Sequence, residues 1–241
     1  MMLKKFKEIF NTQQFQPTFL GIFLNPFYFL RRGLLREIKK NKEFIEGIVL
    51  DFGCGSKPYK NLFEYEKYIG LDIEKSGHDH KNEKIDVFYD GKTIPFEEEY
   101  FDSIFSSEVL EHVENLDEIL KELYRVLKRN SYMLVTIPFV WDEHEIPFDY
   151  TRFTSYGIIN LFKKNNFQII SISKSTNDIE TIFQMINTYI YQFIFPNNKY
   201  WKIILTIFFI SPFNILGIIF SKIFPKKQNF YNNNIVLVKK N

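Results

Sequence analysis

The sequence is poor in cysteine, because its 241 residues contain only Cys54. No disulfide can therefore form within the chain, and we expect a protein of a reducing compartment, the cytoplasm. The N-terminal residues are charged, but no compact apolar stretch with a small-residue cleavage site follows them, so we expect no secretory signal peptide. Internal repeats and low-complexity segments are also lacking, and the length suits one sizeable domain with an elaboration.

A large excess of one charge is lacking as well, since the net charge is +2, but the two signs are unevenly distributed. Residues 1–47 carry nine Lys or Arg against four Asp or Glu, and residues 178–241 carry seven against two. The acidic region between them disfavours nucleic acid as a partner, because a polyanion would be repelled. Basic flanks that are also apolar favour contact with an anionic membrane surface, although solvated charges on ordinary helices would give the same composition.

A glycine turn follows the first apolar run of the acidic region. Residues 48–50 are apolar and lead into Asp51, which is followed by Gly53 and Gly55. The apolar run predicts a buried strand, and the two glycines predict a tight turn where backbone can approach a ligand closely.

A second apolar run ends in another acid, Asp72, seventeen residues after Gly55. A glycine turn after one strand and a carboxylate at the end of the next is how a doubly wound sheet holds a nucleoside-like cofactor. Lys57 and Pro58 stand where a dinucleotide fingerprint would have its third glycine. The pattern therefore favours a ligand with a ribose and no pyrophosphate over a nicotinamide dinucleotide.

Together with three later segments, these residues resemble class I S-adenosylmethionine-dependent methyltransferases of the type 11 group. The matching segments are residues 49–55, 70–73, 90–96, 101–113 and 123–138. Their common order makes the resemblance more specific than any single pair of glycines. It implies S-adenosylmethionine as cofactor and an α/β fold with a doubly wound, seven-stranded, Rossmann-like sheet, mostly parallel with an antiparallel last strand.

The resemblance also implies which residues hold the cofactor. The glycine turn would face the amino-acid part of S-adenosylmethionine, Asp72 would accept hydrogen bonds from the ribose hydroxyls, and Asp90 would lie near the adenine. Asp86 is a competing acid close to Asp90. The expected cofactor-binding residues are Asp51, Gly53, Cys54, Gly55, Ser56, Asp72, Ile73, Asp90, Ser106 and His112.

The loop at residues 141–154 follows the expected fifth strand and starts at the cofactor end of the sheet. Because it gathers polar groups between aromatic ones, we expect it to supply the catalytic residues His144, Asp149 and Arg152, with His144 as general base. The alternatives are a histidine that makes only structural hydrogen bonds, and an ion pair of Asp149 with Arg152 that positions the next helix. The loop also resembles one in methyltransferases associated with bacterial surface-polysaccharide synthesis.

Apolar runs and helix signals alternate along residues 47–178, as in a parallel sheet covered by helices. The expected strands are residues 47–52, 67–72, 84–88, 101–106, 131–138, 167–174 and 233–239. The expected helices are residues 59–64, 115–128 with Asn115 as cap, and 154–165. Three parts follow: an N-terminal aromatic and basic helical cap at 1–46, a cofactor-binding domain at 47–178 and 229–241, and an apolar helical insertion at 179–228.

The insertion contains two apolar segments, residues 179–195 and 203–224, and the second is long enough to span a membrane. A single crossing is excluded, because the last strand must return to the sheet that the sixth strand left. Three arrangements remain. The insertion forms an interfacial hairpin that lies on the inner face of an anionic cell membrane, or a hairpin that crosses the membrane twice, or a soluble cap that is buried in a homodimer.

These observations predict an S-adenosylmethionine-dependent methyltransferase that methylates an oxygen atom of a small, glycan or lipid-linked acceptor. The alternative is a catalytically inactive, membrane-associated scaffold with the same fold. We expect no metal site, because the spacing of Asp142, His144 and Glu145 matches no closed ligand set.

Overall fold

The computed structural model describes residues 10–74 and 83–241, and the chain divides into two compact units. One unit consists of Ile38–Ser173 with Asn234–Asn241, and it contains the sheet. The other consists of the chain up to Glu37 together with Lys174–Asn233, and it is helical. The N-terminal segment and the insertion, which the sequence suggested as separate parts, therefore belong to one unit.

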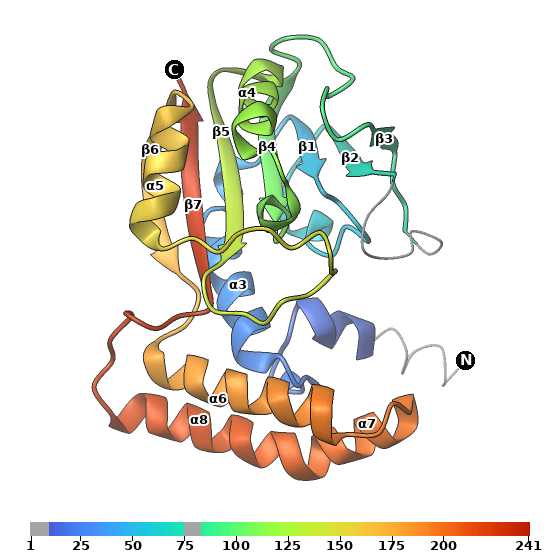
Figure 1. Cartoon of the computed structure of the whole chain (residues 1–241), viewed down its shortest axis with the longest axis vertical. Helices are drawn as coiled ribbons and strands as arrows, with labels where there is room; N and C mark the ends of the chain where they lie inside the picture. The colour runs from blue at the N-terminus through green and yellow to red at the C-terminus, as the bar shows by residue number, and fades with distance from the viewer. Residues whose placement is uncertain (1–9, 75–82) are drawn as a thin grey trace. The chain divides into compact units, whose positions relative to one another are not determined.

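The sheet has seven strands in the order β3-β2-β1-β4-β5-β7-β6 (Figure 1). They are β1 (Ile48–Phe52), β2 (Lys67–Ile73), β3 (Val87–Tyr89), β4 (Phe101–Ser107), β5 (Leu127–Pro138), β6 (Phe167–Lys174) and β7 (Asn233–Lys240). The pairs from β3 to β5 are parallel, and β7 runs antiparallel. The expected Rossmann-like sheet is confirmed.

Two helices of this unit pack their apolar faces into the core of the sheet. In α4 (Leu116–Val126) the buried residues recur at helical spacing, as Leu116, Ile119, Leu120 and Leu123. The second helix, α5 (Ser155–Lys164), is capped by Thr154, whose Oγ1 accepts a hydrogen bond from the Gly157 amide at 3.1 Å. Asn115 was expected to cap α4 in the same way, but its side chain makes no capping hydrogen bond.

The helix expected at residues 59–64 is only a single 3₁₀ turn, Lys60–Leu62. The expected boundaries of β3 and β5 were also displaced, because β3 begins at Val87 and β5 at Leu127. These differences lie at the ends of elements and leave the strand order unchanged.

Strand register brings three chain segments to one edge of the sheet. Asp51 of β1 pairs with Gly70 of β2 and with Phe105 of β4. The turn after β1 therefore lies beside the carboxyl ends of β2 and β4, which is where ligands bind in such sheets.

The helical unit contains a helix at residues 10–15 and five α-helices whose bounds are fully described. They are α2 (Gly21–Leu24), α3 (Tyr28–Lys40), whose last residues enter the sheet unit, α6 (Asp178–Tyr189), α7 (Lys199–Leu205) and α8 (Ser211–Ile223). A π-helical turn, Thr206–Ile210, joins α7 to α8, so Tyr200–Ile223 forms a continuous helix of 24 residues. Asn214 Nδ2 donates to the Ile22 carbonyl at 2.9 Å, and Gln184 Oε1 accepts from the Leu30 amide at 3.2 Å, which binds the insertion to the N-terminal segment.

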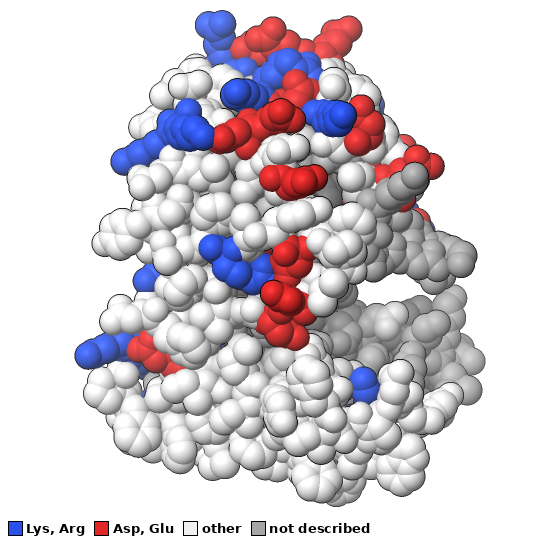
Figure 2. Space-filling view, in the orientation of Figure 1, with Lys and Arg blue, Asp and Glu red and all other residues white. Residues whose placement is uncertain are grey.

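In this unit, polar side chains are buried between the helices and large apolar side chains are exposed, which is the reverse of the usual pattern in a globular protein. The buried polar residues of α6 and α8 are Thr181, Gln184, Asn187, Thr188, Ser211, Asn214 and Ser221. Exposed large apolar residues of α6 to α8 and the turns joined to them include Ile182, Ile186, Tyr189, Phe193, Trp201, Phe208, Phe209, Ile215, Leu216, Ile219 and Ile223. In the view of Figure 2, the surface of these helices accordingly carries few charged side chains.

Candidate active site

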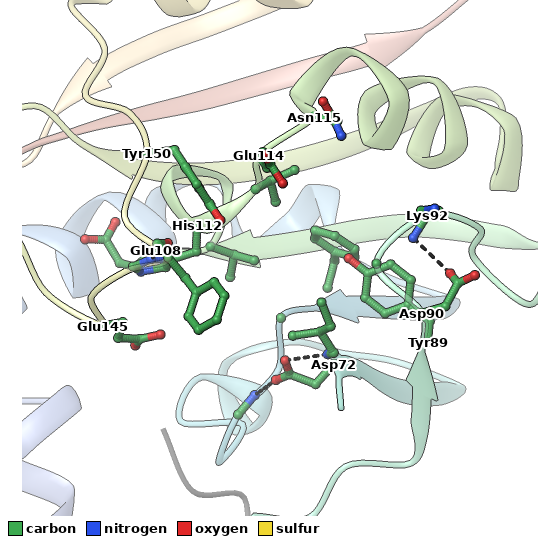
Figure 3. Close-up of a pocket in the computed structure, with 18 residues that line it drawn as sticks. Asp72, Tyr89, Asp90, Lys92, Glu108, His112, Glu114, Asn115, Glu145 and Tyr150 are labelled. Carbon is green, nitrogen blue, oxygen red and sulfur yellow. Dashed lines mark hydrogen bonds between the residues drawn. The ribbon is translucent and has the colours of Figure 1, made fainter. Parts of the chain in front are cut away.

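A cavity of about 330 Å³ opens at the carboxyl edge of the sheet. Its walls come from the turn after β1, the ends of β2 and β3, the segment that follows β4, and the loop after β5 (Figure 3). Of the residues expected to bind the cofactor, six line this cavity: Gly53, Gly55, Asp72, Ile73, Asp90 and His112.

The glycine turn is closed by two hydrogen bonds, because the amides of Gly53 and Cys54 both donate to the Leu71 carbonyl, at 2.8 and 3.1 Å. Gly53 has a φ of +70°, which disfavours any side chain. A Cβ atom at this position would also lie 2.3 Å from Cγ2 of Val109. The turn therefore requires glycine both for its backbone conformation and for its close contact with the segment after β4.

Asp72 lines the cavity at the end of β2 (Figure 3). Its Oδ2 accepts from the Gly55 amide at 2.9 Å, and its Oδ1 accepts from the Ile73 amide at 2.8 Å. These bonds hold the carboxylate in place at the cavity wall. A carboxylate held this way beside a glycine turn fits the two ribose hydroxyls of S-adenosylmethionine.

Asp90 also lines the cavity, where its Oδ1 accepts from the amides of Lys92 and Thr93 at 2.9 Å. These backbone hydrogen bonds lower the pKa of Asp90. Asp86, the competing acid, instead accepts from the Gly70 amide and pairs with Lys57, and it does not line the cavity. Of the two acids, Asp90 is therefore the one that lines the cavity, and its place near the adenine stays a prediction.

Four of the expected cofactor residues do not line the cavity: Asp51, Cys54, Ser56 and Ser106. The Asp51 carboxylate is buried and accepts from the Tyr68 hydroxyl at 2.7 Å, and burial raises its pKa to about 7. Cys54 is buried, and burial raises its pKa as well. Ser56 is exposed, whereas Ser106 is buried within β4 with no hydrogen-bond partner for its Oγ. The structure thus shows no contact of these four residues with the cavity, and their role in binding stays a prediction.

The three expected catalytic residues form one connected group. Arg152 donates to both oxygens of Asp149 at 2.6 Å, and Asp149 Oδ2 accepts from the His144 amide at 3.0 Å. The same oxygen lies 3.3 Å from Nδ1 of His144. Burial raises the pKa of Asp149, but the hydrogen bonds from Arg152 and the His144 amide, together with the charge of Arg152, outweigh burial and lower the pKa to about 2. Asp149 is thus a permanent anion that orients His144.

The side chain of His144 lies close to those of His112 and Glu111, next to the cavity. The two imidazole rings lie 4.7 Å apart, centroid to centroid, at an angle of 80°. Glu111 Oε1 lies 3.8 Å from Nε2 of His112, and the Glu111 side chain is fully buried. Burial raises the pKa of Glu111 and lowers that of His112, because both charged forms are desolvated.

Three residues outside the expected site residues take part in the site: Glu108 and Tyr150 line the cavity, and Glu111 completes the histidine cluster. Glu108 has a φ of +58°, and its Oε1 accepts from Thr136 Oγ1 at 2.8 Å. The spacing of Glu108, Glu111 and His112 immediately after an apolar strand was the available signal. This spacing indicates a site only when the loop after β5 is known to lie beside these three residues.

Comparison with known proteins agrees with this geometry. Residues 50–135 match a family model described as a methyltransferase domain. Comparison with curated protein sequences finds no match.

Solved structures show the same fold at low sequence identity. A Mesorhizobium loti S-adenosylmethionine-dependent methyltransferase is 9% identical with a TM-score of 0.53, covering 88% of this chain and 100% of that one. The cyclase SpnF is 15% identical with a TM-score of 0.54, covering 86% and 81%. Phosphoethanolamine N-methyltransferase 2 of Haemonchus contortus, solved with S-adenosyl-L-methionine, is 20% identical with a TM-score of 0.51, covering 93% and 58%.

These structures establish the fold, and the family model adds the sequence motifs of β1 to β5. The residues at the cavity fit the cofactor that those motifs imply, through the close-packed glycine turn and the fixed Asp72 carboxylate. The chain therefore carries a methyltransferase domain at residues 50–135, with the fold of class I S-adenosylmethionine-dependent methyltransferases, and S-adenosylmethionine is the cofactor that its motifs and cavity support.

Proposed function

We propose that the protein is an active methyltransferase that transfers the methyl group of S-adenosylmethionine to an oxygen atom of a small, glycan or lipid-linked acceptor. The observation that carries this proposal is the cluster of His112, His144 and Glu111 beside the cofactor cavity. A hydroxyl nucleophile must lose a proton as it attacks, and imidazole is the side chain best suited to accept one near neutral pH.

S-adenosylmethionine supplies an already activated methyl group when it is bound, so the protein has to align the acceptor and exclude water. His144 is the proposed base, with Asp149 orienting it through Nδ1 and leaving the Nε2 lone pair available. Arg152 keeps Asp149 ionised and in position. Phe148 and Tyr150 line the cavity from the same loop and would exclude water from the acceptor.

The alternative is a scaffold that keeps the fold without the chemistry. The intact glycine turn and the held Asp72 carboxylate argue against it, because a protein without a cofactor has no need of either. The cyclase SpnF shows that this fold can serve a reaction other than methyl transfer.

Calorimetry with S-adenosylhomocysteine, followed by a turnover assay on hydroxyl acceptors, tests the proposal. Asp72→Ala should weaken cofactor binding strongly, since it removes the acceptor for the ribose hydroxyls. Glu74→Ala removes the same kind of charge two residues later, at an exposed position outside the cavity, and should leave binding unchanged. Absence of cofactor binding by the unaltered protein would refute an enzymatic role.

We further propose that the helical unit associates with an anionic membrane from the cytoplasmic side. Among the described residues, one helix, Tyr200–Ile223, is long and apolar enough to cross a membrane, and only 28% of its apolar stretch is buried. Helices that bury Gln184, Asn187 and Asn214 while exposing large apolar side chains suit an apolar solvent better than water. An interfacial hairpin keeps β7 on the same side as β6, in agreement with their shared sheet.

A basic cavity in the helical unit supports an anionic surface as the partner. This cavity of about 680 Å³ is lined by four cations: Arg32, Arg36, Lys222 and Lys226. One acid, Glu180, also lines it, but its carboxylate is engaged in the capping box of α6. Positive charge beside an exposed apolar surface matches phospholipid head groups above their acyl chains.

Vesicle sedimentation separates this membrane proposal from a homodimer that buries the same apolar face. The protein should bind vesicles of phosphatidylcholine with phosphatidylglycerol more tightly than vesicles of phosphatidylcholine alone. Lys222→Glu with Lys226→Glu should weaken binding by about tenfold or more, given about 1 kcal/mol for each basic residue at such a surface. Lys163→Glu, on the exposed face of α5 in the other unit, is the matched control. A soluble dimer with no affinity for either vesicle would contradict the proposal.

A further inference from the structure

We infer that Glu111, His112 and His144 form a binding site for a divalent transition-metal ion beside the cofactor cavity. The inference deepens the proposed function and rests on it for the role of the ion. It departs from the expectation that the chain has no metal site, which considered only residues close together in the sequence.

The first observation is the distance between the three side chains. One ligand atom from each lies within 4.8 Å of the other two, and Nε2 of His112 is 3.8 Å from Oε1 of Glu111. Metal–ligand bonds of about 2.1 Å place any two ligand atoms no more than about 4.2 Å apart. Small rotations of the side chains therefore close the site around one ion.

The second observation is that Glu111 is buried without a partner. Neither carboxylate oxygen has a hydrogen bond in the described structure, and the residue is 0% exposed. An unpaired buried carboxylate is costly, and a cation bound to it would remove that cost. Arg152, the nearby cation, already donates both of its terminal nitrogens to Asp149.

The third observation is the hydrogen bonding of the two histidines on their other nitrogen. Nδ1 of His112 lies 2.8 Å from the Phe148 carbonyl. Nδ1 of His144 lies 3.2 Å from the Asp142 carbonyl and 3.3 Å from the Asp149 carboxylate. The carbonyl of Phe148 favours the tautomer of His112 with its proton on Nδ1 and the Nε2 lone pair open to a metal. A donor, the Arg152 guanidinium, also lies 3.5 Å from Nδ1 of His144, but the Asp142 carbonyl and the Asp149 carboxylate are closer and favour the same tautomer there. Such carboxylate and carbonyl partners accompany most metal-binding histidines.

Two imidazole nitrogens and one carboxylate oxygen favour a first-row transition ion, such as Zn²⁺, Mn²⁺ or Co²⁺, and leave coordination positions open. An acceptor hydroxyl bound at an open position would have a lowered pKa and lose its proton to water. The resulting oxygen attacks the methyl carbon, so that the O–C bond forms as the C–S bond breaks and S-adenosylhomocysteine leaves. His144 then serves as a ligand in place of its direct role as base.

Metal binding can be measured on the full chain without cofactor or acceptor. The protein is freed of metal with a chelator and titrated with Co²⁺, whose visible absorption reports ligand number, and with Zn²⁺ by calorimetry. Glu111→Gln and His144→Asn should each abolish the Co²⁺ band and weaken Zn²⁺ binding by more than about 100-fold. Asp149→Asn, which alters the partner of His144 and of Arg152 but removes no metal ligand, should weaken it by about 10- to 100-fold.

Two controls make the result specific. The chain has two further histidines, His78 and His80, which lie outside the described residues, so His78→Asn with His80→Asn should leave the tight site intact. Glu145→Gln removes a carboxylate that lines the cavity but is not in the cluster, and it should also retain binding.

Melting temperatures with and without Zn²⁺ guard against unfolded variants. The ion should raise the melting temperature of the unaltered protein and not that of Glu111→Gln, which should remain folded because it replaces an unpaired charge with a neutral amide. Unchanged Zn²⁺ affinity in Glu111→Gln, or no binding by the unaltered chain, overturns the inference. S-adenosylhomocysteine affinity, measured separately, shows in either case whether the proposed methyltransferase function stands.

Discussion

Gly53 is the residue on which the geometry of the cofactor turn depends most directly. Gly53→Ala should destabilise the fold by about 1–3 kcal/mol from its positive φ alone. The contact of its Cβ with Val109 should add to this cost, and it should also weaken S-adenosylhomocysteine binding. Urea unfolding gives the first quantity and calorimetry the second.

Gly157 provides the matched comparison for this substitution. A Cβ there would meet its neighbours at an ordinary 3.4 Å, and the residue lies in the first turn of α5. Gly157→Ala should therefore be neutral or stabilising, by up to about 1 kcal/mol, because alanine favours a helix. Equal losses in the two variants would refute the steric explanation.

Asp51 should make stability depend on pH. Burial raises its pKa to about 7, whereas the unfolded chain has an ordinary carboxyl pKa of about 3.9. Between these values the folded state binds a proton that the unfolded state has lost. The free energy of unfolding therefore falls as pH rises through this window and is not changed further by Asp51 above it.

Asp51→Asn should remove this dependence, since the amide oxygen can still accept from the Tyr68 hydroxyl. Relative to the unaltered protein, the variant should gain up to about 4 kcal/mol of stability on going from about pH 4 to pH 8. Urea unfolding at both pH values measures the difference. A constant difference between the two proteins would show that Asp51 titrates normally.

At the scale of elements, helix caps show where local sequence rules succeed and fail. Asn177 accepts from the Glu180 amide at 3.0 Å and completes a capping box, whereas Asn115 caps nothing and instead lines the cofactor cavity. Asn177→Ala should lower the stability by about 1 kcal/mol, as loss of a cap usually does. Asn115→Ala should change it much less. Thermal unfolding of the two variants compares the same substitution in both settings.

Tertiary packing also explains why residues 59–64 do not form the expected helix. Its residues include Tyr59 and Phe63, which are buried and pack against Phe105 of β4. Packing of these rings onto the sheet holds the segment as a single 3₁₀ turn, Lys60–Leu62. Tertiary contact thus outweighs local helix propensity over so short a stretch.

At the scale of the whole molecule, the N-terminal segment and the insertion should depend on each other. Deletion of residues 179–228 removes the hydrogen bonds of Gln184 and Asn214 to the N-terminal backbone and exposes Phe29. The deleted protein should aggregate or lose cooperative unfolding when measured by gel filtration and calorimetry. A soluble monomer with an unchanged melting temperature would show that the insertion is an independent appendage.

The sequence by itself determined the seven-stranded sheet, its antiparallel last strand and the methyl donor. This was possible because the glycine turn, Asp72 and the apolar strands are local signals whose spacing along the chain encodes a known geometry. It also indicated that His144, Asp149 and Arg152 act together, since they lie within one loop.

Only the tertiary structure decided which residues distant in the sequence lie close together. It brought Glu111 and His112, in the 3₁₀ turn after β4, to His144 in the loop after β5, and left the Glu111 carboxylate buried without a hydrogen-bond partner. It also decided that α6 and α8 bury their amides and expose their apolar side chains, which an apolar segment alone does not reveal. The physical reason is the same in both cases: burial and proximity depend on neighbours that are distant in the chain.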